Sequence, residues 1–129
     1  MTILAHRGAR LDTSCPLCRS ELETPEHLFR SCEVIQHIWR SLSLGIQSMA
    51  NPTVSFIRWL ADHISYLHRS SSTGFSYLLY FFCILRSIWL TRNSIVFEDN
   101  KLEPERILHL AEALHLSHSR LPSLRLDDV

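Results

Sequence analysis

Four residues near the start of the chain have the spacing C-x2-C-x8-H-x4-C, and no other feature constrains its fold as strongly. They are Cys15, Cys18, His27 and Cys32. Two cysteines separated by two residues can bind one metal ion from a single tight turn, and a histidine and a third cysteine can complete a tetrahedron. Because four protein ligands leave no open coordination position, the spacing predicts one structural Zn²⁺ rather than a catalytic ion.

The residues around the second ligand pair predict a helix that ends between two of the ligands. Thr24-Pro25-Glu26 has the pattern of an N-cap, a proline at the first helical position and an acid in the first turn. His27 and Cys32 are five positions apart, about 140° around an ideal α-helix, so they do not share a face. We therefore expect a bend at Cys32, with the metal joining two helices.

Two alternatives to zinc stay open, a redox pair and unrelated cysteines. A redox C-x-x-C requires a strand followed by a helix, and no such context is visible. Disulfides require an oxidising compartment, and residues 1–10 contain no apolar segment typical of a secretory signal. We expect an intracellular protein, nuclear or cytoplasmic, that is not secreted.

The composition is that of an ordinary globular protein. The chain has 129 residues and a formal net charge of zero, which gives no electrostatic indication of nucleic-acid binding. Cys83 lies in an apolar run and is interpreted as a small buried hydrophobe. The histidines outside the motif form no second ligand set. No paired-Asp signature, Gly-rich phosphate loop or catalytic triad is present, so we predict no enzyme and no small-molecule substrate.

Hydrophobic periodicity predicts an all-α fold, a small CCHC zinc knuckle followed by about four helices. The expected helices cover residues 33–44, a segment that starts at Asn51-Pro52, about 75–93 and about 103–117. The second has the apolar stripe Val54, Ile57, Leu60, Ala61, Ile64 and Leu67. Ile95-Val96-Phe97 is interpreted as a turn or an extended stretch, and residues 120–129 as a poorly ordered tail.

The third helix is apolar nearly all round, but it is too short to cross a membrane. The run from Phe75 to Leu85 ends at Arg86, whereas a span needs about twenty apolar residues. A short helix that is apolar on all sides is typical of a protein core. We expect no membrane partner.

Two blocks of the chain are similar to one known family. The first consists of Arg7-Gly8, Asp12, Cys15-Pro16-Leu17-Cys18, the stretch 23–29, Cys32 and Ile38-Trp39. The second is Ile88-Trp89-Leu90-Thr91-Arg92-Asn93 followed by Ile95-Val96-Phe97, which is similar to an Ile-Trp-x-x-Arg-Asn-x-x-x-Phe stretch. With both blocks in this order, the chain resembles the zinc-binding domain of reverse transcriptases from plant LINE-type (non-LTR) retrotransposons.

The resemblance implies a partial domain over residues 7–97, with its N-terminal half missing. The knuckle would cover residues 12–44 and a helical region 52–97, followed by a C-terminal helix and tail over 98–129. The same resemblance assigns the metal ligands to Cys15, Cys18, His27 and Cys32. In the parent polyprotein the polymerase lies upstream and a ribonuclease H-like domain often lies downstream, so the resemblance implies a truncated remnant or a misannotated gene derived from a retroelement.

The expected function is a non-catalytic module that helps a reverse transcriptase bind RNA or single-stranded DNA. Zinc knuckles stack unpaired bases on exposed side chains and place arginines on phosphates. Leu17, Phe29 and Trp39 could stack, although burial in the core is the alternative. The candidate phosphate contacts are Arg7, Arg10, Arg19 and Arg30. The competing hypothesis is a structural or protein-interaction zinc domain that docks on another domain of the polyprotein, which the neutral net charge favours.

Overall fold

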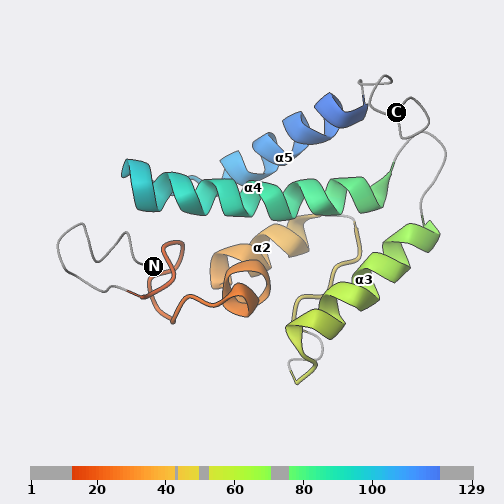
Figure 1. Ribbon diagram of the computed structural model, residues 1–129, viewed down its shortest axis with the longest axis horizontal. Coiled ribbons are helices and arrows are strands. Elements are labelled where there is room, and N and C mark those ends of the chain that lie inside the picture. The colour runs from red at the N-terminus through yellow and green to blue at the C-terminus, as the bar shows by residue number, and fades with distance from the viewer. Residues whose placement is uncertain (1–12, 43, 50–52, 71–75, 120–129) are drawn as a thin grey trace, which may run out of the picture.

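The described residues form five helical elements, and the longest of them, α4, lies between α5 on one side and α2 and α3 on the other (Figure 1). The computed structural model describes residues 13–42, 44–49, 53–70 and 76–119. In order, the elements are η1 (His27–Ser31), α2 (Glu33–Ser41), α3 (Phe56–Ser70), α4 (Tyr77–Glu98) and α5 (Pro104–Ser119). Within those residues, extended pairing is limited to one isolated bridge between Ser14 and Leu22. The predicted all-α fold is confirmed.

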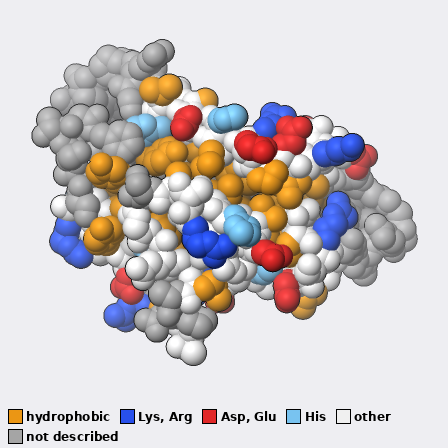
Figure 2. Space-filling view, turned by 180° about the vertical axis from the view of Figure 1, so that it is seen from behind, with side chains coloured by type: hydrophobic (Ala, Val, Ile, Leu, Met, Phe, Trp, Pro, Cys, Tyr) orange, Lys and Arg blue, Asp and Glu red, His pale blue; other side chains and the backbone are white. Residues whose placement is uncertain are grey.

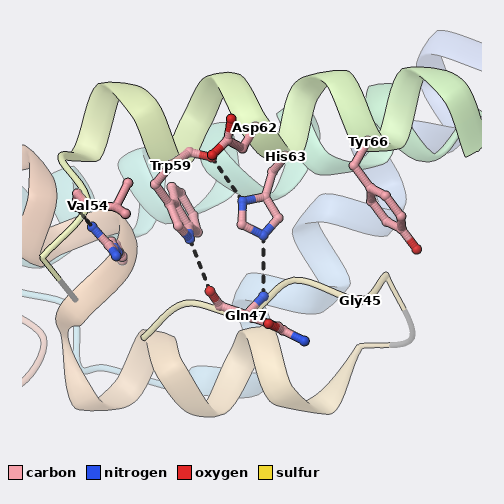
Figure 3. Close-up of a pocket in the computed structure, with 8 residues that line it drawn as sticks. Gly45, Gln47, Val54, Trp59, Asp62, His63 and Tyr66 are labelled. Atoms are coloured by element: carbon pink, nitrogen blue, oxygen red, sulfur yellow. Dashed lines mark hydrogen bonds between the residues drawn. The ribbon is translucent and has the colours of Figure 1, made fainter. Parts of the chain in front are cut away.

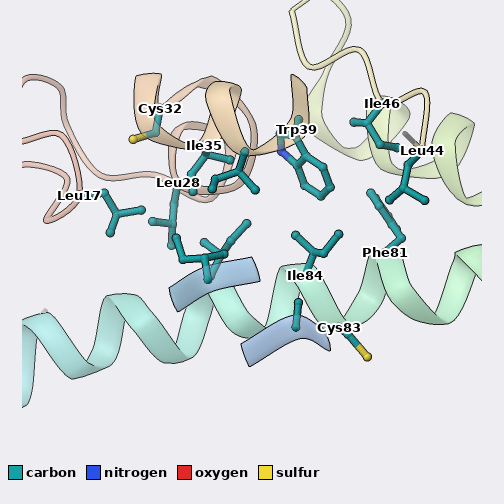
Figure 4. Packing of buried hydrophobic residues seen from close by; sticks show 14 of the residues in the cluster. Leu17, Leu28, Cys32, Ile35, Trp39, Leu44, Ile46, Phe81, Cys83 and Ile84 are labelled. Carbon is teal, nitrogen blue, oxygen red and sulfur yellow. The ribbon is translucent and has the colours of Figure 1, made fainter. Parts of the chain in front are cut away.

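Helix α4 is central because it buries side chains on two sides. Phe81 lies 5.4 Å, ring centroid to centroid, from Trp39 of α2 and 6.3 Å from Trp59 of α3. On another side, the Ser87 hydroxyl donates to the Ile107 carbonyl of α5 at 2.6 Å. Figure 4 shows α2 and α4 directing their apolar side chains toward one another. None of the described helices is long and apolar enough to cross a membrane.

The predicted C-terminal boundary of the central helix was wrong. Ser76 caps its start by accepting a hydrogen bond from the Leu79 N–H at 3.0 Å, and the helix continues to Glu98. Ile95, expected in a turn or extended stretch, is helical and buried. It lies two turns after Ile88, so it continues the same buried stripe. The helix ends at Asp99, which has a left-handed φ of 58°.

Helix α3 begins later than predicted, and its buried side includes Leu60, Ile64 and Leu67 of the predicted stripe but is centred nearer Trp59 than Ile57. The Ser55 hydroxyl accepts from the Arg58 N–H at 3.1 Å, which makes Ser55 the capping residue. The predicted start at Asn51-Pro52 lies outside the described residues. Trp59 and Leu67 are buried, whereas Ile57, expected in the stripe, is 72% exposed. Trp59 sets the phase because its ring packs against Trp39 of α2 at 6.0 Å between ring centroids.

Helix α5 follows the prediction closely. It starts at Pro104, and its buried side includes Ile107 and Ala111 as expected. Cys83, which faces the interior from α4, is also buried as predicted, and burial raises the pKa of its thiol. The predicted tail, residues 120–129, lies outside the described part of the chain.

Candidate metal centre

The four residues of the C-x2-C-x8-H-x4-C motif converge in the structure. The ligand atoms of Cys15, Cys18, His27 and Cys32 all lie within 4.8 Å of one another. The two cysteine sulfurs of residues 15 and 32 are 3.9 Å apart, and the Cys18 sulfur is 3.2 Å from His27 Nε2. With Zn–S and Zn–N bonds of about 2.3 and 2.0 Å, ligand atoms of a tetrahedral site lie roughly 3.5–3.8 Å apart. The two shortest separations, 3.9 and 3.2 Å, are close to this range, so the cluster could hold a zinc ion.

A tight turn places the first two cysteines. The Arg19 N–H donates to the Cys15 carbonyl at 2.8 Å, and Arg19 itself has a left-handed φ of 61°. The Ser20 N–H then points at the Cys18 sulfur at 3.5 Å. The turn thus presents two sulfurs from the same side.

The second ligand pair depends on a π-helical turn. The Thr24 hydroxyl accepts from the His27 N–H at 3.0 Å, which confirms the predicted N-cap. The Cys32 N–H then donates to the His27 carbonyl at 2.7 Å, five residues back. In this wider i→i+5 turn, residues five apart lie nearly above one another, which an α-helix does not allow. The predicted bend at Cys32 is confirmed, since its ψ of 134° is extended.

The sulfurs lie in surroundings that suit a metal. Cys15 and Cys32 are completely buried. The hydrogen bond with Cys32 lowers the pKa of the Cys15 thiol to about 5 despite burial, whereas the same contact, together with burial, raises the pKa of Cys32. Because a coordinating thiol loses its proton, a divalent cation between these sulfurs would favour both as thiolates.

A buried ion pair attaches the knuckle to α4. Arg92 donates to both oxygens of Glu23, from Nε at 2.7 Å and from a terminal nitrogen at 2.9 Å. The Glu23 N–H is bonded to the Thr13 carbonyl, so the carboxylate belongs to the knuckle backbone. The Arg92 guanidinium carbon also lies 5.1 Å from the centroid of the Trp89 ring and 5.9 Å from that of Phe97. Sequence reasoning missed this pair, although its arginine and both rings are in the second block quoted above.

The structure removes Arg30 from the candidate phosphate contacts. Its side chain is only 1% exposed, and it donates to the carbonyls of Ser48 and Val54, each at 2.7 Å. Leu17 and Trp39, considered for base stacking, are buried as well. Arg19 is exposed at the tip of the knuckle turn, and Arg7 and Arg10 lie outside the described residues. The knuckle therefore directs most of its large side chains inward.

A separate pocket of about 450 Å³ lies between α3 and the connector over residues 44–49 (Figure 3). Trp59 donates from its indole nitrogen to the Gln47 carbonyl at 3.2 Å, and the Gln47 N–H lies 3.4 Å from His63 Nε2. His63 Nδ1 is 2.9 Å from the Trp59 carbonyl, so a neutral imidazole protonated at Nδ1 satisfies both contacts. These polar groups hold the connector against the helix.

The comparisons with known proteins support the knuckle. Residues 1–39 match the model of a protein family described as zinc-binding in reverse transcriptase, and this range contains all four clustered residues. The match includes no catalytic domain, and it ends before the block at residues 88–97. Neither the curated proteins nor the solved structures contain a match to the chain. The family match and the cluster together support a zinc-binding module.

Proposed function

We propose that this chain is a non-catalytic, reverse-transcriptase-type zinc module in which Cys15, Cys18, His27 and Cys32 hold one structural Zn²⁺. The convergence of their ligand atoms within 4.8 Å carries the proposal. Three sulfurs and one imidazole nitrogen are the ligands that zinc prefers, whereas magnesium and calcium prefer oxygen. With all four positions filled by protein, the ion would crosslink the chain without activating water.

The surrounding residues would shape and protect this site. The burial of Cys15 and Cys32 excludes water from two of the sulfurs, and the π-helical turn aims His27 at the side on which Cys32 lies. Because the ligands must be free thiols before they bind metal, the proposal implies a reducing, intracellular compartment. All four cysteines of the chain are free.

The finer assignment is to plant LINE-type retroelements, with RNA or single-stranded DNA as the partner. The block at residues 88–97 supports it, because Arg92, Trp89 and Phe97 of that block form a single arrangement around Glu23. Arg7, Arg10 and Arg19 stay candidates for phosphate contacts near the knuckle. Three thiolates on Zn²⁺ would leave the site about one unit negative, which partly offsets these arginines.

A structural or protein-interaction role is the second candidate. The observation that favours it is the burial of Arg30, Leu17 and Trp39, whose side chains pack inside the protein and are not exposed to a nucleic acid. In this alternative, the zinc site would hold helices that dock on another domain of the parent polyprotein.

Metal analysis of the purified chain tests the zinc assignment. We expect one zinc per chain, and Cys18→Ser should abolish stoichiometric binding. Cys83→Ser is the control, because Cys83 is a free cysteine that lies outside the cluster. Zinc content well below one per chain after refolding with zinc, or unchanged content in Cys18→Ser, would contradict the proposal.

A further inference from the structure

One face of α4 exposes aromatic side chains. Phe82 is 44% exposed and Trp89 is 45% exposed. Residues 82, 86, 89 and 93 follow one another at steps of four and three positions, so they lie along the same side of the helix. That side therefore presents Phe82, Arg86, Trp89 and Asn93 in order, so that one exposed ring lies before the arginine and one after it.

The charge on this face is positive. Between Ser76 and Phe97 the chain contains no aspartate or glutamate and two arginines. Arg92 is neutralised by Glu23, whereas Arg86 is exposed and forms no ion pair with the described residues. The stripe of residues 82, 86, 89 and 93 thus carries two rings and one unpaired positive charge, that of Arg86, although the whole chain is neutral.

The Trp89 ring is fixed in place. The guanidinium of Arg92 lies over it, and both oxygens of Glu23 hold that guanidinium. A surface ring that is already ordered loses little conformational freedom when a ligand binds to it. This contact orients Trp89 and leaves 45% of the side chain exposed to a ligand.

We propose that this face of α4 binds single-stranded nucleic acid, with bases stacked on Phe82 and Trp89 and a phosphate against Arg86. The two rings are seven residues apart, about 10 Å along the helix axis, and Arg86 lies between them. Stacking on aromatic rings tolerates any base, so the binding is independent of sequence. The inference rests on the nucleic-acid role proposed above and places its main contact on α4 rather than on the knuckle.

The charges favour nucleic acid over a partner helix on this face. A helix packed along Phe82 and Trp89 would cover Arg86 and remove its charge from water, which is unfavourable without an acidic partner. A phosphate supplies that partner. On the face seen in Figure 2, charged side chains of both signs are mixed, so that view offers no segregated basic surface.

A titration of the zinc-loaded full chain with a fluorescently labelled oligo(dT) or oligo(U) at two salt concentrations tests the proposal. Phe82→Leu and Trp89→Leu keep an apolar side chain but remove the ring, and each should weaken binding by roughly 5- to 150-fold. Trp89→Phe keeps a ring and should retain most of the affinity. Arg86→Gln should reduce the slope of log affinity against log salt by about 0.7.

Leu116→Ala is the matched control, because Leu116 is 53% exposed on α5; it should bind as the wild type does. Zinc content and circular dichroism check that each variant is folded. If Trp89→Leu does not fold, Phe82→Leu still tests the proposal. If the wild type binds and both leucine variants bind equally well, the α4 site is wrong while the nucleic-acid role stands. If the zinc-loaded wild type binds neither oligonucleotide at low salt, the nucleic-acid role itself fails.

Discussion

The α4–α5 pair and the knuckle, residues 13–32, bury different kinds of side chain. The most deeply buried side chains of α5 are the apolar Ile107 and Ala111, whereas those of the knuckle include Cys15, Cys32 and Arg30. The helix pair is stabilised by apolar surface along two regular elements. The knuckle is short and irregular, so it can bury little apolar area and needs crosslinks of another kind. The comparison teaches that one small fold can combine helices stabilised by packing with a segment stabilised by a buried ion pair and by the zinc ion proposed for it.

Removal of zinc should give the largest effect and separates the two regions. Metal binding supplies on the order of 10 kcal/mol in small zinc modules, so a strong chelator should unfold residues 13–41. Helices α4 and α5 should keep much of their protection in hydrogen-exchange mass spectrometry. Equal loss of protection in both regions would show that they form one cooperative unit and would end the distinction.

Truncation of Phe81 tests the packing of α4 against α2 and α3. Phe81 is completely buried between Trp39 and Trp59, so Phe81→Ala should lower the free energy of unfolding by about 3–5 kcal/mol. Phe82→Ala is the matched control, because the neighbouring ring is 44% exposed. Urea unfolding of the zinc-loaded protein measures both, and similar losses in the two variants would argue against the packing described for α4.

The ion pair between the regions should give an effect of intermediate size. Arg92→Met leaves the Glu23 carboxylate, 17% exposed, without its bidentate partner, and we expect a loss of roughly 3 kcal/mol. Adding Glu23→Gln should recover part of that loss. A double-mutant cycle by urea unfolding gives the coupling; additive losses would mean that the pair does not join the knuckle to α4.

The N-cap of the knuckle helix should give the smallest effect. Thr24→Ala removes the acceptor of the His27 N–H and should destabilise the zinc-loaded protein by about 1 kcal/mol. Thr24→Ser keeps the hydroxyl and should behave as the wild type in thermal unfolding. A loss of equal size in both variants would assign the effect to the threonine methyl group instead of the cap.

The sequence predicted well those features that depend on residues close together in the chain. The ligand spacing, the Thr24 cap, the break at Cys32 and the start of α5 at Pro104 all follow from local stereochemistry. The π-helical turn was not predicted, although the five-residue step from His27 to Cys32 is the step that an i→i+5 bond requires.

The errors concern contacts between distant residues. Ile57 was assigned to the buried stripe of α3, but the packing of Trp59 against α2 determines which side is buried. The helix predicted to end near residue 93 continues to Glu98, because Ile95 is buried in the core. Arg92 meets Glu23 across 69 positions of sequence, and no local pattern specifies that distance.

The buried guanidinium of Arg30 has a consequence for the order of assembly. It reaches from η1 to the carbonyls of Ser48 and Val54, which lie on the segment leading into α3. Those carbonyls can be satisfied in this way only after η1 has formed, and two proposed zinc ligands lie at its ends, His27 as its first residue and Cys32 as its C-cap. We therefore expect nascent chains to acquire metal first and to dock α3 last. A cell short of zinc would then accumulate chains in which the α4–α5 pair is folded and α3 is not docked.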